Sequence, residues 1–147
     1  KHYSRMNFNL AELEADDIDP GALPILRDES GNLTEGSGYN VFMATDRVIR
    51  TAPDRALLQG VSRGMVFDLA KQLDVPLVEE DLQPYDLYTA DEAFMASSNV
   101  CILPLTKADN RQVGDAQPGD ITQQLLAAWS EAVGVDIVGQ MERFDAG

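Results

Sequence analysis

The sequence predicts one domain of the α+β class, and three observations lead to that prediction. The stretches 62–73 and 121–133 carry apolar residues at helical spacing. The apolar runs 40–45 and 48–51 flank Asp46-Arg47, a pattern typical of a β-hairpin. Helical and strand patterns are mixed along the chain without strict β-α-β alternation, which favours α+β over a parallel α/β fold.

Three features are predicted before the hairpin. The polar, acidic stretch from Asn9 to Pro20 predicts a short helix that ends before the proline, because proline disfavours helical geometry in the residue preceding it. An apolar run from Ala22 to Arg27 follows this helix. The turn-forming residues from Asp28 to Asn32 end that run.

Two amphipathic helices are predicted after the hairpin. The first follows a serine suited to N-capping, Ser62, and its apolar face consists of Met65, Val66, Leu69, Ala70 and Leu73. The apolar face of the second consists of Ile121, Leu125, Ala128, Trp129 and Ala132.

Shorter elements lie between these helices. Val75 to Val78 predicts a strand, and Pro84 to Tyr88 predicts a polar helical turn. Ala93 to Ser97 and Val100 to Leu105 predict buried strands. The tail from Gly134 to Gly147 has mixed polarity, and its sequence indicates no function.

Composition excludes several classes of protein. The net charge of −14 argues against nucleic acid and against anionic membrane surfaces as partners. No apolar run approaches the ~18 residues that cross a bilayer, and the first residues do not form a signal peptide. A single histidine, His2, excludes a multi-histidine metal site, and we expect no metal. The single cysteine, Cys101, lies in an apolar run, which predicts a buried, inert thiol and fits the reducing cytoplasm.

Four short features could carry chemistry. The stretch 34–40 (TEGSGYN) is a glycine turn that lets backbone approach a flat ligand, and it is equally compatible with an ordinary turn. The stretch 58–63 (LQGVSR) opens a helix, where free amides can bind phosphate or a serine can simply cap the helix. The stretch 94–99 (FMASSN) ends a strand in small polar residues that suit either an anion or a turn. The fourth feature is Lys1, which by itself reads as a solvated lysine.

In their order, these features resemble the second half of fold-type IV pyridoxal-phosphate enzymes. Lysine is followed by LTEGSGYN, LLQGVSRG, YDLYTADEAFMASS and QPGDITQQLLAAW, so the resemblance runs from Lys1 to about Trp129. The family includes branched-chain aminotransferases, D-amino-acid aminotransferases, (R)-selective amine transaminases and aminodeoxychorismate lyase. The resemblance implies the fold of the large C-terminal domain of a D-amino-acid-aminotransferase-like enzyme, with pyridoxal 5′-phosphate as cofactor.

The resemblance also implies which residues surround the cofactor ring. Lys1 would be the catalytic residue: it would hold the cofactor as a Schiff base and later move the substrate proton. Glu35 would pair with the ring nitrogen and keep it protonated, because a nearby negative charge favours the charged form. Leu58 would pack on one ring face, and Gly38 belongs to the turn beside it.

The implied phosphate site uses two other stretches. The amides of Val61 and Ser62, together with the hydroxyls of Ser62 and Ser98, would hold the phosphate through charge-assisted hydrogen bonds. Gly60 precedes them at the start of the predicted helix.

The chain departs from the family pattern near the substrate. Branched-chain enzymes have a tyrosine where this chain has Met6, and two alanines where it has Asn99 and Val100. Tyr39 resembles the aromatic residue of (R)-amine transaminases. We therefore predict that Tyr39, Asn99 and Val100 contact the substrate, whose identity and stereochemistry the sequence leaves open.

The family places a smaller N-terminal domain before its lysine, whereas Lys1 is the first residue here. We therefore expect residues 1–147 to be a single cofactor-binding domain, present as a fragment, a processed product or an excised domain. Its partners would be a small-molecule amino donor, a 2-oxo acid and a second subunit in a cytoplasmic homodimer.

Three functions follow from the resemblance. The leading one is an aminotransferase that moves an amino group between an amino acid, of branched-chain type, or a primary amine and a 2-oxo acid by a ping-pong mechanism. The second is a lyase of the aminodeoxychorismate type, which would eliminate pyruvate with the same lysine and glutamate. The third is a non-catalytic domain that keeps the fold.

Overall fold

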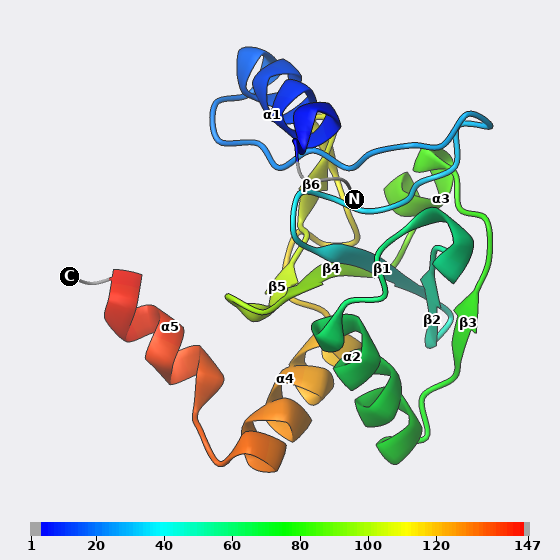
Figure 1. Cartoon of the computed structure of the whole chain (residues 1–147). Coiled ribbons are helices and arrows are strands. Elements are labelled where there is room, and N and C mark those ends of the chain that lie inside the picture. Colours follow the sequence, from blue (N-terminus) through cyan, green and yellow to red (C-terminus); the bar gives the residue numbers. More distant parts are fainter. Residues whose placement is uncertain (1–3, 146–147) are drawn as a thin grey trace.

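A five-stranded sheet organises the molecule, and the computed structural model describes residues 4–145 around it (Figure 1). Its strands are β1 (Asn40–Thr45), β2 (Val48–Thr51), β3 (Leu77–Glu79), β4 (Glu92–Ser97) and β5 (Cys101–Pro104). They lie in the order β3-β2-β1-β4-β5, with β2 and β3 parallel and the other neighbours antiparallel. This mixed sheet, with helices packed against it, confirms the α+β prediction.

The hairpin β1–β2 has the predicted bounds. Asp46 and Arg47 connect its strands with φ values of 52° and 62°. Such left-handed turns match the twist of the flanking strands, and aspartate adopts this conformation more readily than most residues. The register pairs Phe42 with Thr51 on one side and with Phe94 of β4 on the other.

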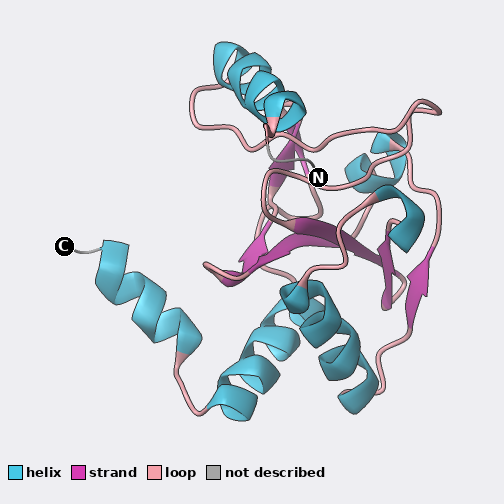
Figure 2. Cartoon of the chain, viewed as in Figure 1, coloured by secondary structure: helices cyan, strands magenta, loops and turns pink. Residues whose placement is uncertain are grey.

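Helices α2 (Val61–Gln72) and α4 (Asp120–Val133) cover one face of the sheet (Figures 1 and 2). The rings of Phe42 and Phe94 stack beneath them at a centroid distance of 5.1 Å, an arrangement worth about 0.5–1.5 kcal/mol beyond burial. Leu125 and Trp129 of α4 are buried in the same cluster, as predicted. Ala132 is exposed, contrary to the prediction, as are all residues from 131 to 134 at the end of α4.

A second apolar cluster lies on the opposite face of the sheet. It includes Met43 and Met95 from the strands and Leu87 from α3 (Pro84–Tyr88). Leu33, from the segment that follows the 28–32 turn, also packs there. Figure 2 shows these covering segments as loops and one short helix, in contrast to the two long helices on the other face.

Helix α1 (Met6–Ile18) begins three residues before the predicted start and, as predicted, ends before Pro20. It buries Phe8 and leaves Met6, Leu10 and Leu13 more than half exposed. None of the helices within residues 4–145 is long and apolar enough to cross a membrane.

Several elements differ from their predictions. β3 begins two residues later and ends one residue later than predicted. β5 forms within the predicted range 100–105, but it is an edge strand in which only Ile102 is buried, so the prediction of its burial was wrong. Edge strands have one unpaired side, which leaves their side chains less covered. Cys101 is correspondingly half-buried rather than buried.

Two further elements were not predicted from the sequence: the hairpin of β6 (Lys107–Ala108) and β7 (Arg111–Gln112), and the C-terminal helix α5 (Ile137–Asp145). Ile137 is buried against the helical cluster, and Figure 1 shows α5 extending from the end of α4 away from the sheet. A short 3-10 helix (Asp54–Ala56) lies in the connection between β2 and α2.

Candidate functional site

The sheet register brings most of the predicted site residues to one end of the sheet. Asn40, the first residue of β1, pairs with Ala96 near the end of β4, so the 34–40 turn and Ser98 lie at the same end. The connection that leads to α2 also reaches this end, because the Leu58 amide donates to Glu35 Oε2 at 3.1 Å. Three of the four predicted features therefore converge in space.

Lys1, the fourth feature, lies outside the described residues. The first described residues adjoin the same end of the sheet, because Arg5 Nη2 donates to Ser37 Oγ at 2.6 Å. Lys1, the predicted nucleophile, is thus close in sequence to Arg5, which contacts the glycine turn.

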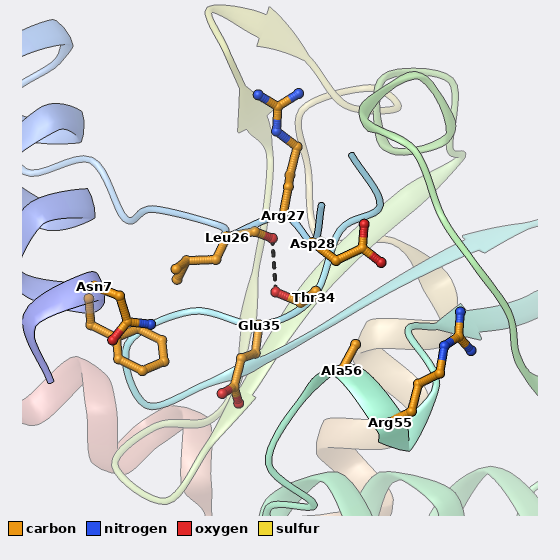
Figure 3. Close-up of a pocket in the computed structure, with 9 residues that line it drawn as sticks. Asn7, Leu26, Arg27, Asp28, Thr34, Glu35, Arg55 and Ala56 are labelled. Carbon is orange, nitrogen blue, oxygen red and sulfur yellow. Dashed lines mark hydrogen bonds between the residues drawn. The ribbon is translucent and has the colours of Figure 1, made fainter. Parts of the chain in front are cut away.

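Glu35 is the acidic residue of the site. Its side chain is 7% exposed, and its backbone forms an isolated bridge with Asn40. A cavity of about 460 Å³ adjoins it. Figure 3 shows Glu35 and Arg27 extending in opposite directions from this region. The cavity is lined by Asn7, Phe8, Leu26, Arg27, Asp28, Thr34, Glu35, Arg55 and Ala56.

The glycine turn beside Glu35 is held by Tyr39. The amide of Gly36 donates to the Tyr39 carbonyl at 3.0 Å, and a Cβ on Gly36 would collide with the Tyr39 ring. Gly38 has a φ of 116°, a conformation that favours glycine. The Tyr39 hydroxyl donates to the Pro24 carbonyl at 2.5 Å, and burial raises the pKa of Tyr39, so the hydroxyl stays protonated as a donor. The structure thus gives Tyr39 a packing role, and its predicted contact with substrate stays a prediction.

The start of α2 differs from the prediction. Its N-cap is Gly60, with extended backbone, so Ser62 is the second helical residue and does not cap the helix. Ser62 is 7% exposed, whereas Val61 is 89% exposed. Within residues 4–145, no side chain caps this end of the helix. Helix N-terminal amides without such partners favour anions, since the helix dipole places positive potential there.

Ser98 and Asn99 are exposed in the loop between β4 and β5, and Val100 is half-buried. The Ser97–Cys101 pair closes this loop, with Cys101 in the left-handed region at a φ of 56°. Burial raises the pKa of the Cys101 thiol, which keeps it protonated and disfavours its action as a nucleophile. The loop presents its serine beyond the strand end, as the sequence suggested.

Asn40, the last residue of the 34–40 stretch, has a role in the site that was not predicted from the sequence. Its side-chain Nδ2 donates to the Leu58 carbonyl at 3.1 Å, and the residue is 4% exposed. A polar residue at the first position of a strand that is otherwise apolar could have signalled this role, because buried polar groups require partners. Within residues 4–145, no group of three or more His, Cys, Asp or Glu side chains is placed to hold a metal ion.

Comparisons with known proteins agree on one family. The family model described as amino-transferase class IV matches residues 1–108. The branched-chain-amino-acid aminotransferase of Pseudomonas aeruginosa is 33% identical over 109 residues, which cover 74% of this chain and 36% of that protein. The D-alanine aminotransferase of Listeria innocua is 36% identical over 122 residues, covering 82% of this chain and 42% of that protein.

Solved structures give the same result. The branched-chain amino acid aminotransferase of Escherichia coli superposes with a TM-score of 0.80 and 32% identity, covering 84% of this chain and 40% of that one. The branched-chain amino acid aminotransferase of Thermoproteus uzoniensis, solved with norvaline, superposes with a TM-score of 0.78 and 30% identity, covering 91% of this chain and 48% of that one. A further branched-chain amino acid aminotransferase, solved as a complex with N-(5'-phosphopyridoxyl)-L-glutamate, superposes with a TM-score of 0.80 and 29% identity, covering 87% of this chain and 42% of that one. The chain spans about two-fifths of the length of the curated relatives it matches.

Proposed function

The chain belongs to the amino-transferase class IV family, and we propose that it is the pyridoxal 5′-phosphate-binding domain of an aminotransferase. The enzyme would move an amino group between an amino acid, of branched-chain type, or a primary amine and a 2-oxo acid, in two half-reactions. The names of the relatives support this activity, since they include branched-chain-amino-acid and D-alanine aminotransferases. The part of the relatives that this chain does not match would supply the remainder of the active site.

One observation carries the proposal: a buried carboxylate and an uncapped helix start are linked through Leu58. Glu35 accepts the Leu58 amide at 3.1 Å, and Leu58 lies three positions before Val61, where α2 begins. The two groups suit opposite ends of pyridoxal phosphate, because one can pair with a protonated ring nitrogen and the other with a phosphate. The residues present therefore fit this cofactor.

Each residue would then have a defined task. When bound, pyridoxal phosphate supplies an electron-withdrawing ring that carries the amino group between donor and acceptor. Lys1 Nζ would attach the cofactor and transfer the substrate proton, and Glu35 would hold a proton on the ring nitrogen. The exposed side chain of Leu58 would cover one face of the ring.

The phosphate would be held by groups from two loops. The amides of Val61 and Ser62 open α2, and the Ser62 hydroxyl is available because the residue does not cap the helix. The Ser98 hydroxyl would approach from the loop between β4 and β5. Gly60 and Gly38 would let backbone come close to the cofactor, and Tyr39, Asn99 and Val100 would lie near the substrate.

The test uses the complete protein, titrated with pyridoxal phosphate and followed by absorption before and after borohydride reduction. In the wild type and in Lys71→Ala we expect a visible band that borohydride abolishes while it attaches the cofactor covalently to the protein. In Lys1→Ala we expect no covalent attachment of the cofactor. Lys71 is the matched control, because it is an exposed lysine at the last turn of α2, away from the start of the helix. A band of equal intensity in Lys1→Ala would contradict the assignment.

The reaction type needs a second measurement on the loaded protein. Adding an amino donor alone should abolish the visible band, and adding a 2-oxo acid should restore it, because the two half-reactions are separate. Release of many equivalents of pyruvate per protein without an amino acceptor would contradict the aminotransferase proposal, because the first half-reaction with an alanine donor yields only one equivalent. We further propose a cytoplasmic homodimer, which sedimentation equilibrium of the complete protein and fractionation of the source cells would test.

A further inference from the structure

Asn40 lies between the two halves of the proposed cofactor site. It is the first residue of the central strand β1, where it pairs with Ala96 of β4 and forms an isolated bridge with Glu35. At 4% exposure its amide side chain is cut off from water, so its hydrogen bonds must come from the protein. Its Nδ2 donates to the Leu58 carbonyl at 3.1 Å.

Leu58 is therefore held on both sides of its backbone. Its amide donates to Glu35 Oε2 at 3.1 Å, and its carbonyl accepts from Asn40 Nδ2 at 3.1 Å. Because Glu35 and Asn40 are themselves bridged, the two side chains that hold Leu58 originate from one short stretch of backbone. Two hydrogen bonds, one at the Leu58 amide and one at its carbonyl, thus fix the position of Leu58 relative to the Glu35 carboxylate.

The same side chain also contacts the start of α2. A Cβ built on Gly60 would lie 2.7 Å from Asn40 Oδ1, which is closer than real Cβ contacts. The absence of a side chain at Gly60 allows the helix start to pack directly against the Asn40 amide. Asn40 consequently sets how closely the first turn of α2 approaches β1.

We propose that Asn40 is a positioning residue that sets the distance between the Glu35 carboxylate and the first amides of α2. The inference rests on the proposed function, in which these groups hold opposite ends of pyridoxal phosphate. A ligand that occupies two subsites at once gains most when their separation matches its length. Disturbing Asn40 should therefore impair joint occupation of the two subsites more than occupation of either one.

Two variants disturb the contact from opposite sides. Asn40→Asp keeps the shape of the side chain but removes the donor to Leu58, since a carboxylate only accepts hydrogen bonds. Gly60→Ala leaves every hydrogen-bonding group in place and introduces a Cβ against Asn40 Oδ1. Either variant should shift Leu58 and the start of α2 relative to Glu35, and agreement between them excludes an effect peculiar to one substitution.

Thr51→Val is the matched control. The Thr51 hydroxyl is fully buried in the same sheet and donates to the Val41 carbonyl at 2.7 Å. Removing it costs a buried hydrogen bond from a side chain to a backbone carbonyl, as Asn40→Asp does, but this bond joins β2 to β1 and does not involve Leu58. Comparison with this control separates a loss of stability from a loss of positioning.

The experiment measures dissociation constants of the complete apo-protein for three probes: pyridoxal phosphate, pyridoxal and inorganic phosphate. For Asn40→Asp we expect the constant for pyridoxal phosphate to rise by roughly five- to a hundredfold, the range that corresponds to leaving the buried Leu58 carbonyl unpaired. Gly60→Ala should raise the same constant through the displacement of the helix start. In both variants the constants for pyridoxal and for phosphate should rise much less than the constant for pyridoxal phosphate. Thr51→Val should lower the melting temperature without changing any of the three constants.

Two results would overturn the inference. In the first, Asn40→Asp and Gly60→Ala bind pyridoxal phosphate with the same dissociation constant as Thr51→Val. In the second, the two variants bind pyridoxal phosphate, pyridoxal and phosphate more weakly by the same factor, as a purely structural role would predict. A wild-type protein that binds no pyridoxal phosphate would instead remove the proposed function, and with it this inference. A wild type that binds tightly alongside unaffected variants would remove the inference alone.

Discussion

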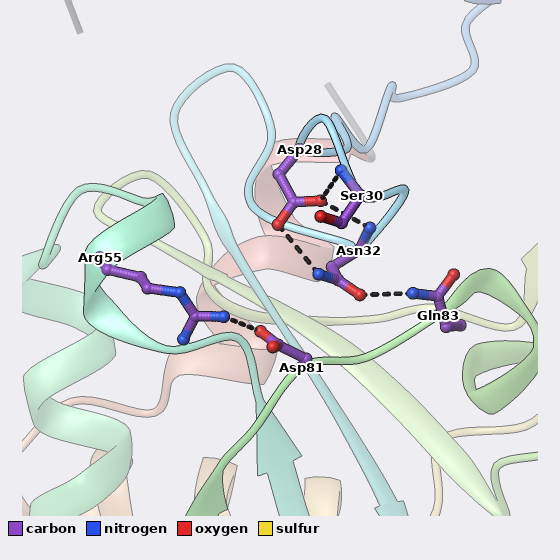
Figure 4. Close-up of polar contacts among 6 residues, drawn as sticks. All are labelled: Asp28, Ser30, Asn32, Arg55, Asp81 and Gln83. Carbon is purple, nitrogen blue, oxygen red and sulfur yellow. Dashed lines mark hydrogen bonds and ion pairs between the residues drawn. The ribbon is translucent and has the colours of Figure 1, made fainter.

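At the scale of single residues, Asp28 organises the turn that leads into the site. Its Oδ1 accepts the amides of Ser30 and Asn32, both at 2.9 Å, and its Oδ2 accepts Asn32 Nδ2 at 3.0 Å (Figure 4). Gln83 in turn donates to Asn32 Oδ1, which ties the turn to the start of α3. The segment 33–35, which ends in Glu35, follows this turn directly. The hydrogen bonds of the Asp28 carboxylate therefore help to position the start of that segment.

The Asp28 network predicts a specific pH dependence. Hydrogen bonds from the side chain and the backbone of Asn32 lower the pKa of Asp28 from its ordinary value of 3.8. Because the pKa is lower in the folded state, this carboxylate stabilises the fold above about 3.8, and the contribution is lost as pH falls through the folded-state pKa. Asp28→Asn should therefore melt a few degrees below the wild type at neutral pH, and the difference should shrink in acid.

Thermal unfolding followed by circular dichroism across this pH range measures the effect. Glu29→Gln is the control, because it removes the same charge from an exposed position in the same turn. It should change the melting temperature little at any pH. A difference between Asp28→Asn and the wild type that stays constant into acid would show that the carboxylate charge is not the cause.

At the scale of elements, Glu92 of β4 attaches α4 to the sheet. Its two carboxylate oxygens accept the amides of Ile121 and Thr122 at 3.0 and 2.9 Å, and Oε2 also accepts the Thr122 hydroxyl at 2.7 Å. A Cβ on Gly119, the N-cap residue, would collide with this carboxylate. Glu92, a strand residue, thus caps α4, and its carboxylate interacts favourably with the positive potential at the helix start.

Glu92→Gln should destabilise the fold, because the side-chain NH2 of the glutamine would face a group that is itself a donor. That group is either the backbone amide of Ile121 or the amide and hydroxyl of Thr122. The expected loss is about 1–3 kcal/mol, the cost of a buried group left without its partner. For a domain of this size each kcal/mol lowers the melting temperature by about 2–4 °C. Glu131→Gln, at an exposed position of α4, removes the same charge and should have little effect; an equal shift in both variants would argue against a capping role for Glu92.

The helix starts illustrate what the sequence could and could not predict about elements. The apolar spacing placed α2 and α4 within one residue of their observed starts, because burial against a sheet imposes a helical period. Local capping rules assigned Ser62 to the N-cap, whereas the cap is Gly60, whose neighbour Asn40 is distant in sequence. The roles of Asn40 and Glu92 depend on strand pairing. A polar residue at the start of an apolar strand can signal a need for buried partners, but the local pattern does not reveal which residues those partners are.

The same reasoning applies to the candidate site. The order of Glu35, Ser62 and Ser98 along the chain identified the family, which the comparisons support. Their convergence at one end of the sheet followed only from tertiary contacts, namely the antiparallel pairing of β1 with β4 and the hydrogen bond from the Leu58 amide to Glu35. The edge position of β5 and the contact of Ile137 with the helical cluster are likewise tertiary features, which explains why the exposure of β5 and the existence of α5 escaped prediction.

At the scale of the whole molecule, one sheet supports two apolar clusters and presents the candidate site at one end. The strands contribute alternate side chains to the two faces, so that Phe42 lies under the helices and its neighbours Val41 and Met43 lie in the opposite cluster. Unfolding of the sheet would therefore expose the apolar side chains of both clusters to water. The two faces should therefore unfold together, and the geometry of the site should persist as long as the sheet does.

A substitution in one cluster, observed from the other, tests this coupling. Leu87 is 3% exposed on the loop-covered face, and Leu87→Ala should cost about 2–5 kcal/mol through lost burial and the cavity left behind. Trp129, the only tryptophan of the 147-residue chain, lies in the cluster on the opposite face. If the faces unfold together, Leu87→Ala lowers the melting temperature reported by Trp129 fluorescence by the same amount as that reported by far-ultraviolet circular dichroism. Two separate transitions, with fluorescence unchanged, would mean that the helical face is stable without its partner.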